Sequence, residues 1–157
     1  MGNEKNKKIN ILYIDDEIEN LSGFKASFRR FYNIYTAESA EEGMEFLKNN
    51  EIEIILTDQR MPGITGIEFL QSIIETYPDP IRILVTGYSD IEAVINAVNK
   101  GRIYKYVSKP WNTDELRDTI EKAYEIYSLR KENEQLTNDL KRVNKQMEFM
   151  LRQKLIS

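Results

Sequence analysis

The stretch IEIILTDQRMPG, residues 52–63, contains the features that decide the fold of this chain. Residues 52–56 form a mainly apolar run that predicts a strand buried in a sheet, and the Met-Pro-Gly that follows predicts a loop. Asp58 stands between them, at the end of the predicted strand. A carboxylate there can cap a helix, bind a metal, act as a general base or act as a nucleophile. Its role therefore depends on which other side chains reach the same place.

Strand patterns and helix patterns alternate five times along the chain. Short apolar runs predict strands at residues 9–14, 32–37, 52–56, 81–85 and 103–107. Apolar residues at helical spacing predict helices at residues 18–30, 39–47, 67–77 and 89–101, and from residue 112 onward. Because parallel strands need crossover connections, this order predicts a doubly wound parallel α/β sheet. We expect a flavodoxin-like (βα)5 domain with strand order 2-1-3-4-5 and an extended C-terminal helix.

Length and composition favour one domain with an appendage. The chain has 157 residues, a net charge of −4, and neither cysteine nor histidine. These absences exclude disulfides and thiolate chemistry and remove the commonest general base and metal ligand. An acidic chain is not typical of a general nucleic-acid binder, so no direct nucleic-acid partner is expected. No apolar run approaches the roughly 18 residues of a membrane span, so we expect a cytoplasmic protein without a membrane partner.

Three segments are expected along the chain. Residues 1–8 are polar and are predicted to be a disordered leader, and residues 9–127 are predicted to form the folded domain. Residues 128–157 are predicted to be a helical coiled-coil extension. This extension carries seven Lys or Arg and four Asp or Glu, although the whole chain is acidic. The contrast in charge suggests two parts with different roles.

Five polar residues are expected at one rim of the sheet. Ligands of open α/β sheets bind outside the carboxyl ends of the strands, where the strand order reverses. The residues that follow or end strands there are Asp15, Asp16, Asp58, Thr86 and Lys109. Neighbouring carboxylates repel one another unless they take up protons or bind a cation, and oxygen ligands without His or Cys suit Mg²⁺. A lysine and a hydroxyl that can contact a phosphate complete a site for phosphoryl transfer onto Asp58.

Each of these residues has a simpler explanation when taken alone. An aspartate after a strand more often caps the next helix, and Lys109 alone would be a solvated surface lysine. The prediction therefore depends on the common position of all five residues. Five such side chains at one rim of the sheet favour a functional site over five separate structural roles.

Four motifs in this order resemble the receiver domain of bacterial two-component response regulators. They are DDE (15–17), TDQRMPGITG (57–66), VTGYSD (85–90) and YVSKPW (106–111), and the resemblance covers about residues 9–127. It implies that Asp58 is the phosphoacceptor, supplied by a phosphohistidine on a sensor histidine kinase or phosphotransfer protein. It also implies Mg²⁺ held by Asp16, Asp58 and the backbone carbonyl of Arg60, with Asp15 acting through water. Lys109 would pair with the phosphoryl group, and the Lys109–Pro110 bond is expected to be cis.

The same resemblance implies a switch. In receivers a Ser or Thr that ends the fourth strand turns towards the phosphoryl oxygen, and an aromatic on the fifth strand fills the vacated space. Here these positions are Thr86 and Tyr106, although ordinary half-buried packing would also explain Tyr106. Arg60 and Tyr88 flank the site and are expected to influence how fast the acyl phosphate hydrolyses. Together, TDQRMPG and Trp111 resemble the branch of receivers with phosphodiesterase, phosphatase or transcriptional outputs.

The C-terminal segment shows apolar residues at heptad spacing. Position a is taken by Ile126, Asn133, Leu140 and Met147, and position d by Leu129, Leu136, Val143 and Met150. A buried Asn at position a favours a parallel two-stranded coil, so we expect a parallel homodimer through residues 126–150. The alternative is a helix that frays in solvent or folds back on its own domain. An output domain either lies C-terminal to this segment and is missing from the chain, or the coil itself is the partner surface.

Two other functions compete with the receiver. A phosphatase of the haloacid-dehalogenase kind also uses an aspartyl nucleophile, but it requires a second Asp two residues later, where this chain has Arg60. A pseudo-receiver that is never phosphorylated and serves only dimerisation would not need the complete set of site residues. We therefore expect a phosphoacceptor signalling module rather than an enzyme.

Overall fold

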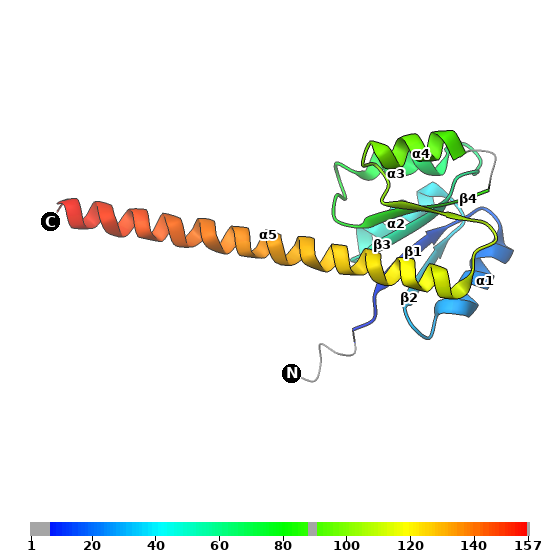
Figure 1. The fold of residues 1–157 in the computed structure, drawn as a ribbon, viewed down its shortest axis with the longest axis horizontal. Coiled ribbons are helices and arrows are strands. Elements are labelled where there is room, and N and C mark those ends of the chain that lie inside the picture. Colours follow the sequence, from blue (N-terminus) through cyan, green and yellow to red (C-terminus); the bar gives the residue numbers. More distant parts are fainter. Residues whose placement is uncertain (1–6, 88–90, 157) are drawn as a thin grey trace.

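The computed structural model describes residues 7–87 and 91–156 and forms a five-stranded parallel sheet between two layers of helices (Figure 1). The strands are β1 (Asn10–Ile14), β2 (Asn33–Ala37), β3 (Ile54–Asp58), β4 (Ile81–Thr86) and β5 (Lys105–Ser108). The helices are α1 (Ile18–Phe28), α2 (Ala40–Asn49), α3 (Gly66–Ile73), α4 (Ile91–Asn99) and α5 (Thr113–Ile156). The strand order is 2-1-3-4-5, which confirms the predicted fold class.

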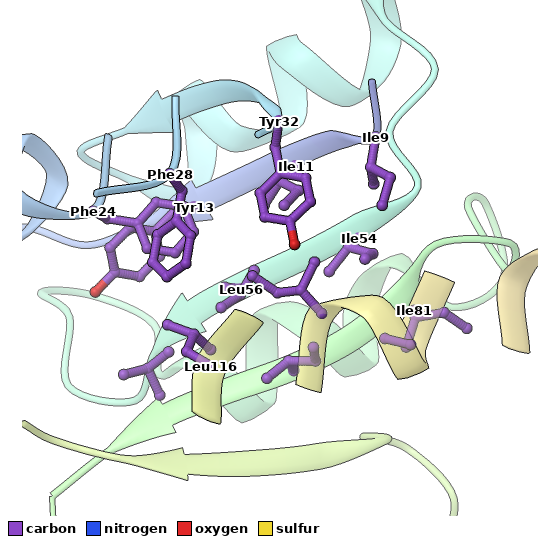
Figure 2. Close-up of a cluster of buried hydrophobic side chains, with 14 of the residues drawn as sticks. Ile9, Ile11, Tyr13, Phe24, Phe28, Tyr32, Ile54, Leu56, Ile81 and Leu116 are labelled. Carbon is purple, nitrogen blue, oxygen red and sulfur yellow. The ribbon is translucent and has the colours of Figure 1, made fainter. Parts of the chain in front are cut away.

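Each face of the sheet has its own hydrophobic core. One core joins alternate residues of the central strands to α1 and α5, and Figure 2 shows part of it, with Tyr13 and Phe24 side by side. The other core joins the intervening strand residues to α2, α3 and α4. Strands β1 and β3 are almost wholly buried, which explains why their sequences are nearly continuous apolar runs.

Side chains cap the start of α2. The hydroxyl of Ser39 accepts a hydrogen bond from the Glu42 N–H at 3.2 Å, and the Glu42 carboxylate accepts one from the Glu38 N–H at 2.9 Å. Ser39 therefore satisfies a backbone donor that the first turn of α2 leaves without a helical partner, and Glu42 binds the residue just before the N-cap.

The third strand differs from its predicted bounds. It spans Ile54–Asp58 instead of residues 52–56, so Asp58 is its last residue. The ladder with β4 continues to the pair Asp58–Val85, because the neighbouring strand is long enough to keep pairing after the apolar run ends. The sequence pattern did not predict this extension, because the last side chains of the strand are polar.

Helix α5 leaves the domain and continues far beyond it (Figure 1). Its buried residues lie in the first half, and the last of them is Tyr127. Lys131 then forms an ion pair with Asp79 in the connection before β4. Beyond Lys131 the apolar side chains of the helix are exposed. Within residues 7–87 and 91–156, no helix has the length and apolar character needed to cross a membrane.

Two parts of the sequence predictions fall on residues that the structure does not describe. Tyr88, expected beside the site, lies among residues 88–90, which are outside the described part of the chain. Residues 1–6 of the predicted leader lie outside it as well.

Candidate functional site

Three carboxylates meet where β1 and β3 end. Each of Asp15, Asp16 and Asp58 offers a carboxylate oxygen, and these oxygens all lie within 4.8 Å of one another. Asp15 is fully buried, Asp58 is 8% exposed and Asp16 is exposed. The place is the switch point of the sheet, because β1 pairs with β2 on one side and with β3 on the other. The three carboxylates thus lie together at this rim, as the sequence predicted.

Lys109 brings a positive charge into the same pocket. Its Nζ lies 3.0 Å from Oδ1 of Asp58 and 3.2 Å from Oδ2 of Asp15. The backbone holds it there, because the Lys109 N–H donates to the Thr86 carbonyl at 2.9 Å. The Lys109–Pro110 peptide bond is cis, as expected. One ammonium thus occupies the space between the buried carboxylates, where a cation is electrostatically favoured.

Asp15 accepts hydrogen bonds from four donors. The Tyr13 hydroxyl at 2.9 Å, the Asn20 amide at 3.1 Å and Lys109 reach its Oδ2, and the Glu17 N–H at 2.9 Å reaches Oδ1. A buried carboxylate normally needs such partners to remain charged. The sequence pattern did not reveal Tyr13 and Asn20 as site residues. A tyrosine in an apolar strand reads as core, and Asn20 reaches Asp15 only through the turn into α1.

Burial and ion pairing oppose each other at Asp58. Burial raises the pKa of the Asp58 carboxyl, and this outweighs the hydrogen bond and charge of Lys109, which lower it. Burial lowers the pKa of the Lys109 ammonium, but the carboxylates of Asp58 and Asp15 raise it by more than that. The pKa of Lys109 is therefore above its ordinary value. The lysine therefore stays charged at neutral pH, whereas the Asp58 carboxylate is charged at some energetic cost. A cation bound here would relieve that cost.

The loop after Asp58 is fixed by Gln59, a residue that the sequence pattern did not single out. Its N–H donates to the Val85 carbonyl at 3.1 Å, and its side-chain oxygen accepts from the Ile67 N–H at 3.0 Å. Its carbonyl accepts from the Gly66 N–H at 3.0 Å. Gly66 lies so close that a Cβ there would contact the Asp58 carbonyl oxygen and the Leu84 side chain. These contacts hold the first turn of α3 directly against the end of β3.

The two predicted switch residues lie on neighbouring strands. Thr86 is buried at the end of β4, and its hydroxyl donates to the Gly87 carbonyl at 3.1 Å. Tyr106 is half-buried on β5 and packs against the core that α2, α3 and α4 cover. In the ladder Tyr106 pairs with Leu84, two residues before Thr86, so Thr86 and Tyr106 face the same side of the sheet.

Arg60 lies at the open side of the pocket. It is exposed and lines a shallow hollow together with Asp16, Gln59 and Met61. The predicted role of its backbone carbonyl as a metal ligand stays a prediction.

Most of the chain matches one known protein family. A model of the response regulator receiver domain matches residues 11–121. The chain belongs to this family. The hydrogenase transcriptional regulatory protein HoxA of Cupriavidus necator is 36% identical to this receiver over 135 residues. That alignment covers 86% of this chain but 28% of HoxA, so the chain spans less than a third of that relative.

Solved structures show the same fold. A receiver domain protein from Clostridium thermocellum is 31% identical, with a TM-score of 0.72, and the match covers 77% of this chain and 98% of that one. An adenylate cyclase from Rhodopirellula baltica is 26% identical, with a TM-score of 0.81, covering 84% and 98% respectively. This chain is therefore a receiver domain of the two-component signalling family, a module that typically signals rather than catalyses.

The acidic pocket has the donor chemistry of a magnesium site. Its candidate side-chain ligands are carboxylate oxygens, which suit a hard divalent cation. Asp16 and the hollow beside it leave the site open on one side, where Mg²⁺ can keep water or phosphate oxygens as ligands. The residues present therefore fit the ion.

Proposed function

We propose that Asp58 is the phosphoacceptor of a magnesium-dependent phosphoryl transfer from a phosphohistidine on a partner kinase. The observation that carries this proposal is the convergence of Asp15, Asp16, Asp58 and Lys109 on one pocket at the switch point of the sheet. Asp16, Asp58 and the Arg60 carbonyl would hold Mg²⁺ directly, and Asp15 through water.

The proposed reaction forms one bond and breaks one. A carboxylate oxygen of Asp58 attacks the phosphorus, the O–P bond forms, and the P–N bond of the donor breaks. The leaving imidazole takes up a proton from solvent. Bound Mg²⁺ would offset charge on the phosphoryl oxygens. Lys109 already lies 3.0 Å from Asp58, so its ammonium can also contact the negative oxygens of the transferring group.

The proposed switch uses Thr86 and Tyr106. A phosphoryl group adds roughly two negative charges and three acceptor oxygens at the end of β3. The Thr86 hydroxyl now donates to a backbone carbonyl next to it, and it would exchange that partner for a phosphoryl oxygen. Tyr106, half-buried on the same side of the sheet, would then move into the space that Thr86 leaves.

The competing functions make different predictions. A phosphatase would need an acid two residues after Asp58, and Arg60 cannot supply a proton at neutral pH. A pseudo-receiver would not need a lysine held between two carboxylates, because bringing these charges out of water costs desolvation.

The decisive experiment is incubation with acetyl phosphate and Mg²⁺, followed by intact-mass measurement. We expect one phosphate adduct, lost when Mg²⁺ is chelated and absent in Asp58→Asn. Catalytic release of phosphate from small esters would favour the phosphatase, and a chain without any adduct would favour the pseudo-receiver.

For α5 we propose a parallel homodimer through residues 126–150. The apolar side chains assigned to the heptad seam from Leu129 onward are exposed, including Leu140 at 61% and Met150 at 68%. They lie on a helix that runs well clear of the domain, as Figure 1 shows. An exposed apolar row of this length is stabilised when a second helix covers it.

The output of this receiver is also a proposal. HoxA is named as a transcriptional regulatory protein, and the matched part is 28% of its length. We propose that this receiver likewise controls a transcriptional output carried by a segment or protein beyond residues 1–157. We propose residues 9–127 as the receiver unit, 128–157 as the coiled coil, and the cytoplasm as the place of action.

A further inference from the structure

Tyr13 has two kinds of neighbours that no other described residue combines. Its hydroxyl donates to Oδ2 of Asp15 at 2.9 Å, inside the acidic pocket. Its ring packs edge-on against Trp111, with centroids 6.1 Å apart and the planes at 85°. Trp111 lies between Pro110 and α5, two residues after Lys109. One fully buried side chain thus connects the pocket to the corner where the long helix starts.

The surroundings of Tyr13 leave it little freedom to move on its own. It is fully buried, and its ring lies 4.7 Å from that of Phe24, as Figure 2 shows. Phe24 in turn packs edge-on against Trp111 at 6.1 Å, so the three rings touch one another. In a close-packed cluster of this kind, a shift of the Tyr13 hydroxyl must be shared with the neighbouring rings.

The contacts of Asp15 couple it to Tyr13. Its Oδ2 accepts from Tyr13, Asn20 and Lys109 at once, so it has little remaining capacity to accept. A cation in the pocket would compete with Lys109 for the negative charge of Asp15, and the Asp15 carboxylate would turn towards the ion or its water. The Tyr13 hydroxyl would then follow Asp15, because a hydroxyl buried without a partner is unfavourable.

We propose that Tyr13 is a positioning residue of the acidic pocket: its hydroxyl orients Asp15 for the cation, and its ring passes a change at Asp15 to Trp111 and the start of α5. This inference rests on the proposed magnesium site. It adds a route on the α1 and α5 side of the sheet, whereas Thr86 and Tyr106 lie on the opposite side.

Trp111 is the only tryptophan of the chain, so its emission reports on this corner directly. The experiment is titration of the full chain with Mg²⁺, followed by Trp111 fluorescence and, in parallel, by calorimetry. The test variant is Tyr13→Phe, which keeps the ring and removes only the hydroxyl. The matched control is Tyr32→Phe, because the Tyr32 hydroxyl donates to Glu121 and not to the pocket.

In the wild type we expect a saturable change of Trp111 emission with the same midpoint as the calorimetric binding curve. In Tyr13→Phe we expect roughly tenfold weaker Mg²⁺ binding, as for loss of other groups that orient metal ligands, and a smaller emission change at saturation. Tyr32→Phe should behave as the wild type. Lys109 remains in all these proteins, so a route through Lys109 alone would leave the Tyr13→Phe signal intact.

A second variant separates orientation from transmission. Asn20→Ala removes another donor to Asp15 but leaves the Tyr13 contact to Trp111 in place. We expect weaker binding with a full emission change at saturation, and this result stands even if Tyr13→Phe does not fold. Unchanged affinity and emission in Tyr13→Phe, or wild-type binding without any emission change, would overturn the inference. A wild type that binds no Mg²⁺ would overturn the proposed function and this inference with it.

Discussion

At the scale of single residues, burial disfavours the charged form of the Asp58 carboxyl, whereas the ammonium of Lys109 favours it. Because burial dominates, the pKa of Asp58 is raised. The folded chain then holds the Asp58 proton more tightly than the unfolded chain does, so the charged carboxylate makes the fold less stable at neutral pH. A cation bound beside Asp58 would relieve this cost.

Asp58→Asn should therefore stabilise the protein while abolishing phosphorylation. At pH 7 without Mg²⁺ we expect a gain of about 1 kcal/mol in the free energy of unfolding, within the range for relieving a functional site. The gain should shrink as the pH falls through the raised pKa of Asp58, because the wild-type carboxyl then becomes neutral as well. Thermal unfolding from neutral to acidic pH measures this. A gain that grows towards acid pH would contradict it.

Thr86→Ala should separate phosphorylation from its structural consequence. The hydroxyl is not the nucleophile, so we expect the same stoichiometry of phosphate from acetyl phosphate as in the wild type. Hydrogen exchange of the β5 amides should change on phosphorylation of the wild type but not of Thr86→Ala. Ser108→Ala is the matched control, since it removes an exposed hydroxyl from the neighbouring strand end. An equal change in β5 of Thr86→Ala would exclude the switch.

At the scale of elements, the pocket depends on how closely α3 approaches the end of β3. Gly66 allows that approach, because a Cβ there would meet the Asp58 carbonyl oxygen and Leu84. Gly66→Ala should cost roughly 1–3 kcal/mol of stability, as overpacking usually does, and should slow phosphorylation of Asp58 by displacing its backbone. Denaturant unfolding and the rate of adduct formation measure the two effects.

Gly23→Ala provides the control for this prediction. Gly23 lies inside α1, where an added Cβ would meet nothing within 4 Å, and its backbone has no positive φ. An alanine there should stabilise the helix by about 0.5–1 kcal/mol and leave phosphorylation unchanged. If both glycine variants behaved alike, close approach at Gly66 would not be the reason for its presence.

The elements also indicate where sequence reasoning succeeds and where it stops. Strand order and the meeting of Asp15, Asp58 and Lys109 were predictable, because parallel strands bring their carboxyl ends to one rim. The last two residues of β3 were not, since only the partner strand decides how far pairing continues. The contacts of Tyr13 and Gln59 were not predictable either, because each depends on a neighbour that only the folded chain supplies.

At the scale of the whole molecule, α5 places an apolar row in solvent. Leu140→Asp should abolish the proposed dimer, because a charge at position a would be buried without a partner. Sedimentation equilibrium should then give a monomer. Asn138→Asp adds the same charge to an exposed residue outside the two seam positions, and should remain a dimer. Equal masses for Leu140→Asp and the wild type would contradict this interface.

The long helix has a mechanical consequence. About 29 residues of α5 lie beyond Tyr127, which at 1.5 Å per residue is a rod of roughly 44 Å. A tilt of about 5° at the Trp111 corner, where the 44 residues of α5 begin a rod of about 66 Å, would displace its far end by about 6 Å. In the proposed dimer, two paired helices of this length could not tilt independently. Changes of a fraction of an ångström near Asp58 would become changes in the relative orientation of two whole domains.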